Sequence, residues 1–172
     1  TAEELAACRL EGTDEPVPYL EEVLPIHEGK TPLVVEIKPY KGNHAELTKR
    51  TCELLDRFPQ LTYCIESFDP RLRRHRPEIV RGQLSCNFLK DRNGLVLPAA
   101  FLLTNLMTGF LTAPDFIAYR FSDRKNASLR LCRGLWGVQE FSWTIRSAED
   151  AKTALDDGCL IIFEHCVPGE KE

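Results

Sequence analysis

The stretch "TPLVVEIKPY", Thr31 to Tyr40, ends an aliphatic run with two opposite charges. The aliphatic run predicts a β-strand that belongs in the protein interior. Alternate residues of a strand share a face, so Glu36 and Lys38 would lie on the same face as Val34. The pair is therefore expected either to close the end of a strand as a structural ion pair or to belong to a functional site.

Five more apolar segments of strand length follow along the chain. They are "LTYCI" (61–65), "RGQLS" (81–85), "FIAYRF" (116–121), "EFSWTI" (140–145) and "CLIIF" (159–163). Several have no polar face, which is typical of strands in a parallel sheet that helices cover on its faces.

Helical signals occupy the segments between these strands. The capping pairs are Asn43 with Glu46, Asp69 with Pro70, and Ser147 with Asp150. The expected stops are Pro59, Pro77 and Gly158. Each pair places a side-chain acceptor or a proline where a helix begins, and proline or glycine often ends one. The window 96–111 is the most apolar of the chain and predicts a helix packed on a core.

The repeated order of strand and helix predicts an α/β fold with a parallel sheet. The sequence contains no glycine-rich phosphate-binding motif, so a barrel is favoured over a dinucleotide or P-loop fold. In such barrels, functional groups gather at the carboxyl ends of the strands. Polar or aromatic residues fall at those ends here: Glu36, Lys38, Ser67, Trp143 and Glu164.

Composition narrows the class of protein. A chain of 172 residues with 43% hydrophobic residues and a net charge of -4 is long enough for one sizeable core. The basic run 71–77 reads as a solvated helix face, so no nucleic-acid partner is expected. The seven cysteines include no C-x-x-C pair, which favours a reducing, cytoplasmic setting. No segment predicts a membrane span.

Five segments, in order, resemble one enzyme family. They are "VPYLEEVLPIHEGKTPLVVEIK" (17–38), "IESFDPRLRRHRPEIVRGQLS" (65–85), "PDFIAY" (114–119), "SWTIRSAEDA" (142–151) and "GCLIIFE" (158–164). Each is short, but their common order over almost the whole chain resembles the glycerophosphodiester phosphodiesterases.

The resemblance implies a (β/α)8 barrel of the TIM type, of which this chain supplies strands 3 to 8. Residues 1–172 would then form a single, incomplete barrel domain. The resemblance also implies a metal-dependent enzyme that hydrolyses glycerophosphodiesters to glycerol 3-phosphate and an alcohol. Glu36 matches a ligand of a divalent cation, Mg²⁺ or Ca²⁺, and Lys38 matches a lysine that meets the substrate phosphate. Trp143 matches an aromatic residue beside the substrate, although packing in the core would explain it equally well.

The chain departs from the family pattern at the catalytic histidines. The family's histidine pair and two of its metal carboxylates belong to motifs that are absent here, so the chain alone is expected to have little activity. His44 and His165 are the histidines nearest the expected strand ends. The first and last strands present would have open edges, which suggests a missing segment, a second polypeptide or a second copy.

Two other functions are compatible with the same residues. A partial barrel can be a non-catalytic binding module that retains Glu36 and Lys38 as an ion pair. A different metal-dependent barrel hydrolase would need further carboxylates near Glu36, for which Glu66 and Glu164 are the candidates. The sequence does not identify the leaving alcohol.

Overall fold

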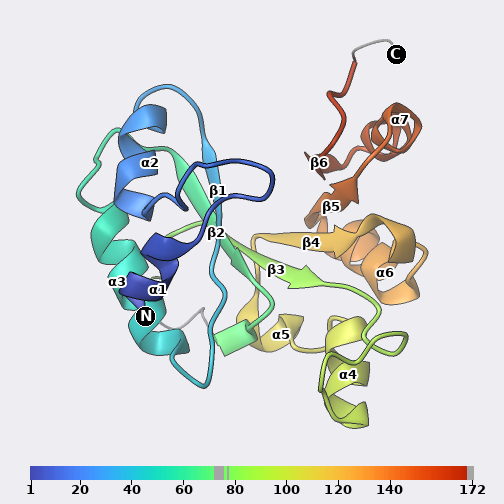
Figure 1. The fold of residues 1–172 in the computed structure, drawn as a ribbon. Coiled ribbons are helices and arrows are strands. Elements are labelled where there is room, and N and C mark those ends of the chain that lie inside the picture. Colours follow the sequence, from blue (N-terminus) through green and yellow to red (C-terminus); the bar gives the residue numbers. More distant parts are fainter. Residues whose placement is uncertain (72–75, 77, 170–172) are drawn as a thin grey trace.

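The computed structural model describes residues 1–71, 76 and 78–169. Six parallel strands form one sheet in the order β1-β2-β3-β4-β5-β6, and the sheet curls into a half-barrel with helices between its strands (Figure 1). The α/β prediction is therefore confirmed. A parallel order needs a crossover after every strand, and the intervening segments provide these crossovers.

All six predicted strands are present, most within one or two residues of the expected bounds. They are β1 (Leu33–Glu36), β2 (Tyr63–Ser67), β3 (Arg81–Ser85), β4 (Phe116–Arg120), β5 (Gln139–Ile145) and β6 (Leu160–Phe163). The helices are α1 (Ala2–Ala7), α2 (Leu20–His27), α3 (His44–Leu55), α4 (Leu97–Thr104), α5 (Gly109–Thr112), α6 (Ala127–Trp136) and α7 (Ala148–Asp156), with a 3₁₀ helix η2 (Phe121–Asp123).

The outer face of the sheet carries the helices. At the β1 end, Ile65 of β2 is buried in one apolar cluster with Cys52 and Leu55 of α3, and Leu33 and Val35 of β1 pack against the same cluster. Because side chains alternate along a strand, Val34 and Glu36 must face the inside of the half-barrel. The two faces predicted for this strand are confirmed.

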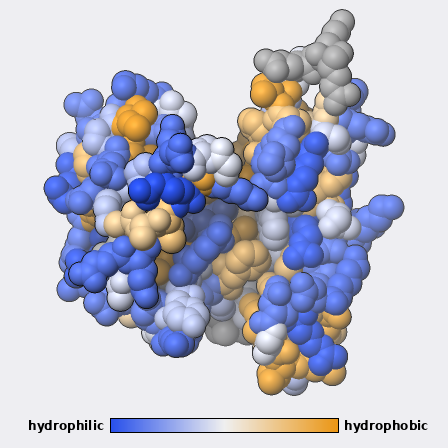
Figure 2. Space-filling view, in the orientation of Figure 1, coloured by the Kyte–Doolittle hydropathy of each residue, from blue (hydrophilic) through white to orange (hydrophobic). Residues whose placement is uncertain are grey.

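The inner face has an aromatic core of its own. Leu84, Phe116 and Ala118 are buried there, and Phe141 and Trp143 pack against them. The rings of Phe116 and Phe141 stack with centroids 4.3 Å apart. These side chains come from β3, β4 and β5, so the middle of the half-barrel is packed rather than hollow. Figure 2 shows the surface hollowed beside this region, between the N-terminal and C-terminal parts of the chain.

Two of the predicted helix starts have the expected caps. The Ser147 side chain accepts a hydrogen bond from the Asp150 backbone N–H, and Gly158 follows α7 with a positive φ of 75°. Asp69 accepts from the Arg71 backbone N–H at 2.9 Å. The rest of the predicted 69–77 helix, with its basic run, lies largely outside the described residues.

The prediction for the start of α3 is wrong in one respect. Asn43 is the N-cap residue, but its side chain makes no capping bond. The Asn43 Oδ1 atom instead accepts from the Tyr40 backbone N–H at 2.7 Å, so it is used in the turn that precedes the helix.

The apolar window 96–111 forms two short helices instead of one. Ala100 and Thr104 are the buried residues of α4, while Phe101 remains 50% exposed. A cavity of about 740 Å³ lies on the outer side of the sheet between this region and α6, lined by Phe101, Met107 and Trp136 among others. The helix therefore packs on the core along one side only.

Within the described residues, β1 and β6 each pair with a single neighbouring strand, so both edges of the sheet are open. All seven cysteines are free thiols. In the part of the chain that the structure describes, no helix is both long enough and apolar enough to cross a membrane.

Candidate functional site

Glu36 and Lys38 lie at the carboxyl end of β1, on the inner face. The Lys38 Nζ atom is 3.2 Å from Glu36 Oε2, so the two side chains form an ion pair. The side chains of Lys38 and Glu36 are 77% and 30% exposed, respectively. Glu36 and Lys38 therefore form the ion pair that the sequence allows. The Lys38 side chain nevertheless remains accessible to solvent. An ion pair with this exposure is weak and can open to bind other groups.

Glu66 is the neighbour of Glu36 in the sheet. The two residues are partners in the parallel register of β1 and β2, and Ile65 beside Glu66 belongs to the outer cluster. Glu66 therefore faces inward together with Glu36, and not toward the helices on the outer face. Burial, together with the negative charge of Glu36, raises the pKa of Glu66 to about 7.

The carboxylate of Glu66 is incompletely bonded. Glu66 is only 5% exposed, and its Oε2 atom is buried without a hydrogen-bond partner among the described residues. An unsatisfied buried oxygen is costly to the folded state, so its presence needs an explanation.

Trp143 belongs to the inner face of β5. Its ring meets Phe68 edge to face at 5.7 Å, and Phe68 meets Phe88 in the same way at 6.0 Å. The guanidinium of Arg120 lies over the indole, 5.5 Å from its centroid. The indole Nε1 is buried and has no partner among the described residues. Trp143 thus packs in the aromatic core and also carries a free donor.

A charged rim beside Trp143 consists of Arg120, Asp123 and Lys90, and it was not predicted from the sequence. Arg120 follows the apolar part of β4, as Glu36 follows that of β1, and this shared position was the signal available in the sequence. Arg120 Nη1 lies 3.7 Å from Asp123, whose side chain is 2% exposed and is already bonded to Lys90 Nζ at 2.6 Å. One buried carboxylate therefore holds two cations at this rim.

Among the described contacts, none joins the remaining predicted positions to Glu36. Glu164 forms a salt bridge with Arg146 at 2.5 Å. His44 begins α3, and its Nδ1 atom is buried without a hydrogen-bond partner among the described residues. His165 follows β6 with a positive φ of 60°. Among the described contacts, neither histidine is bonded to Glu36 or Lys38.

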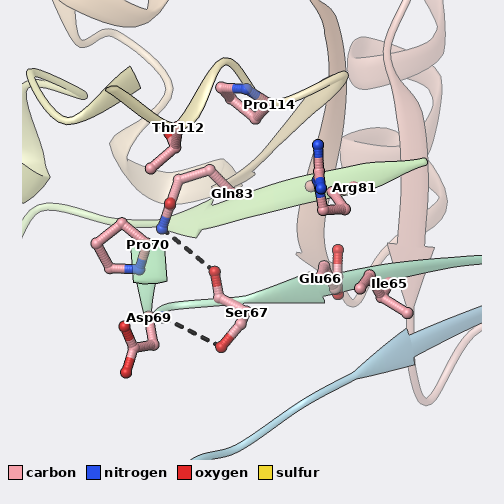
Figure 3. Close-up of a pocket in the computed structure, with 10 residues that line it drawn as sticks. Ile65, Glu66, Ser67, Asp69, Pro70, Arg81, Gln83, Thr112 and Pro114 are labelled. Carbon is pink, nitrogen blue, oxygen red and sulfur yellow. Dashed lines mark hydrogen bonds between the residues drawn. The ribbon is translucent and has the colours of Figure 1, made fainter. Parts of the chain in front are cut away.

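A pocket on the sheet shows how the ends of β1, β2 and β3 are fixed (Figure 3). The Ser67 hydroxyl donates to the Ile37 carbonyl at 2.6 Å, and the Gln83 side chain donates to the Ser67 carbonyl at 3.2 Å. The Ser67 hydroxyl oxygen also accepts a hydrogen bond from the Asp69 backbone N–H. With a volume of about 20 Å³, this pocket can hold a water molecule but no substrate. Its polar network instead positions the strand ends beside Glu36.

The residues present fit part of a cation site. The buried, unpartnered oxygen of Glu66 and the neighbouring carboxylate of Glu36 are hard oxygen ligands of the kind that Mg²⁺ and Ca²⁺ prefer. Among the described residues, no group of three or more histidine, cysteine, aspartate or glutamate side chains is placed to hold a metal ion. These two carboxylates can therefore supply only part of a coordination shell.

Comparisons of sequence identify no relative. No protein-family model matches the chain, and no curated protein sequence matches it.

Comparison with solved structures gives a consistent result. A phosphodiesterase from Oleispira antarctica, solved with sn-glycerol-3-phosphate, is 17% identical with a TM-score of 0.63, over 86% of this chain and 57% of its own. A glycerophosphodiester phosphodiesterase from Parabacteroides distasonis is 15% identical with a TM-score of 0.67, over 95% and 66%. One from Thermotoga maritima is 16% identical with a TM-score of 0.63, over 87% and 61%. The chain thus spans about three fifths of the length of these structures, and its six strands have the fold of the corresponding part of their TIM-type barrel.

Proposed function

We propose that this chain forms part of a metal-dependent glycerophosphodiester phosphodiesterase, which hydrolyses glycerophosphodiesters to glycerol 3-phosphate and an alcohol. The observation that supports this most is the Glu36–Lys38 pair, exposed on the inner face at the carboxyl end of β1, in a fold that these enzymes share. Residues 1–172 would be one incomplete barrel domain that contributes strands 3 to 8.

Each proposed site residue has a distinct role. Lys38 would leave its ion pair to bind the substrate phosphate, and Glu36 would bind a divalent cation, Mg²⁺ or Ca²⁺. When bound, the cation would neutralise charge on the phosphoryl oxygens. Trp143 would present its indole edge to the glycerol or the alcohol, with its unpartnered Nε1 as a hydrogen-bond donor. None of these residues is an obvious acid or base for the reaction.

The acid and base would come from elsewhere. The family's histidine pair belongs to strands that precede β1 in the barrel, and the open edges of β1 and β6 could receive those strands. The 172-residue chain alone is then expected to hydrolyse substrate little or not at all. Seven free thiols support a reducing, cytoplasmic location.

A non-catalytic binding module is the second candidate function. The observation that favours it is that Glu36 and Lys38 neutralise each other at 3.2 Å, which leaves Lys38 without free charge for a phosphate. The two functions differ in whether Lys38 binds an anionic ligand at this position.

Binding of glycerol 3-phosphate distinguishes these functions without requiring turnover. Isothermal titration of the chain in Mg²⁺ or Ca²⁺ should show binding that Lys38→Met weakens about 10-fold or more, since a charge-assisted hydrogen bond contributes roughly 1.5–3 kcal/mol. Lys49→Met is the matched control, because Lys49 is equally exposed in its pair with Glu53 on α3. Equal affinity for glycerol 3-phosphate in the wild type and Lys38→Met would overturn the proposed role of Lys38.

Hydrolysis tests the enzyme itself. Glycerophosphocholine should release glycerol 3-phosphate only when a polypeptide carrying the family's histidines is added, and EDTA should abolish the release. Intact mass under denaturing conditions identifies which polypeptides are present. Full activity from the 172-residue chain alone, or activity unaffected by EDTA, would contradict this assignment.

A further inference from the structure

We propose that Glu66 is a second carboxylate ligand of the cation site, adjacent to Glu36. The inference rests on the proposed function for the existence of a cation at Glu36, and it adds a residue that the family motif does not supply. It follows from strand register, burial and an unsatisfied oxygen.

Register places the two carboxylates side by side. Glu36 and Glu66 are partners in the parallel pairing of β1 and β2, with adjacent strands spaced about 4.8 Å apart. Both side chains leave the sheet on its inner face, because Ile65 lies in the outer cluster. Two glutamates at this separation can therefore direct oxygens to one point, as the ligands of a shared cation must.

Burial makes an isolated Glu66 unfavourable. Its side chain is only 5% exposed, and its Oε2 atom has no partner among the described residues. The neighbouring carboxylate adds repulsion to this cost of burial. A divalent cation between the two groups would satisfy the free oxygen and replace the repulsion by attraction, so one ligand accounts for both features.

In the part of the chain that the structure describes, Glu66 has no salt-bridge partner that would satisfy its carboxylate. Lys38 pairs with Glu36, at its Oε2 atom, while Cys64 and Gly82 flank Glu66 on the inner face through strand alternation and register. Gly82 has no side chain, and the ring of Phe116 occupies the space where its Cβ atom would lie. Among the described residues, no lysine or arginine is recorded in a salt bridge with Glu66, although such a pair would have been the simplest alternative.

Calcium binding to the 172-residue chain tests this assignment. We expect isothermal titration with Ca²⁺ alone, after removal of metal by EDTA and dialysis, to show binding that Glu36→Gln and Glu66→Gln each weaken by about 10-fold or more. Glu53→Gln is the control, because Glu53 is 60% exposed in its pair on α3. Near-ultraviolet circular dichroism checks that every variant is folded.

The outcomes separate the inference from the proposed function. If Glu66→Gln binds Ca²⁺ like the wild type while Glu36→Gln does not, Glu66 is no ligand, although the cation site at Glu36 stands. If the wild type binds neither Ca²⁺ nor Mg²⁺, both this inference and the metal-dependent function fail. Should Glu66→Gln not fold, the carboxyl ¹³C shift of Glu66 in the wild type gives the answer, and a shift unchanged by Ca²⁺ overturns the inference.

Discussion

Asp123 is the buried carboxylate of the rim beside Trp143. Burial alone would raise its pKa, but Lys90, the Asn87 backbone N–H and Arg120 together hold the pKa below its ordinary value. Stability from this group is therefore present above the ordinary aspartate pKa near 4 and is lost as the pH falls through the lower folded-state value. We expect Asp123→Asn to lower the free energy of unfolding by about 1–3 kcal/mol at pH 7.

Urea unfolding at pH 7 and at pH 3 measures this effect. The difference between the wild type and Asp123→Asn should shrink at the lower pH, where the wild-type carboxylate begins to take up a proton. Asp156→Asn serves as the control, since Asp156 is 63% exposed in its pair with Lys152. A deficit of the same size at both pH values would show that geometry, and not charge, stabilises the rim.

At the scale of residues, the sequence indicates the site only where a strand ends. Glu36 and Lys38 could be identified because they interrupt an aliphatic run, and their face follows from alternation. The pairing of Glu66 with Glu36 could not be predicted from the sequence, because it depends on the register between two strands about thirty residues apart. The contact of Arg120 with Trp143 could not be predicted either, because it also joins two different strands.

Among the elements, β3 and β4 pack closely on the inner face at Gly82. A Cβ atom at Gly82 would lie 2.1 Å from the ring of Phe116, which is buried and stacked on Phe141. We expect Gly82→Ala to lower the free energy of unfolding by about 1–3 kcal/mol, since the ring must move. Combining it with Phe116→Leu should recover part of that loss, as measured by a double-mutant cycle in urea. Additive costs in the double variant would contradict the proposed steric clash.

The elements themselves were largely predictable, and the exceptions have local causes. Buried strands produce long apolar runs, so all six were found, and α7 was marked at both ends by Ser147 and Gly158. The cap of α3 was not predictable, because Asn43 has two competing acceptor roles and the turn at Tyr40 takes precedence. The division of window 96–111 into α4 and α5 was hidden because apolar residues follow one another without a helical period.

At the scale of the molecule, sequence pattern gives strand order but not closure. Alternating strands and helices predict a parallel sheet, and the resemblance to a family supplied the number of strands in the full barrel. Curvature and edges depend on contacts between strands distant in the chain. In the half-barrel observed among the described residues, the edges of β1 and β6 are therefore exposed.

Those open edges predict self-association of the isolated chain. Val34 of β1 and Leu160 of β6 are 44% and 50% exposed, and unpaired backbone groups beside such apolar side chains favour pairing with another sheet. Sedimentation velocity should show dimers or larger species that increase with concentration, and Leu160→Lys should weaken this association about 10-fold or more. Leu155→Lys is the matched control, because Leu155 is 49% exposed but lies on α7, away from the edge. A monomer at all concentrations, or equal weakening by both variants, would mean that the edges do not drive association, and the second-copy explanation would then fail.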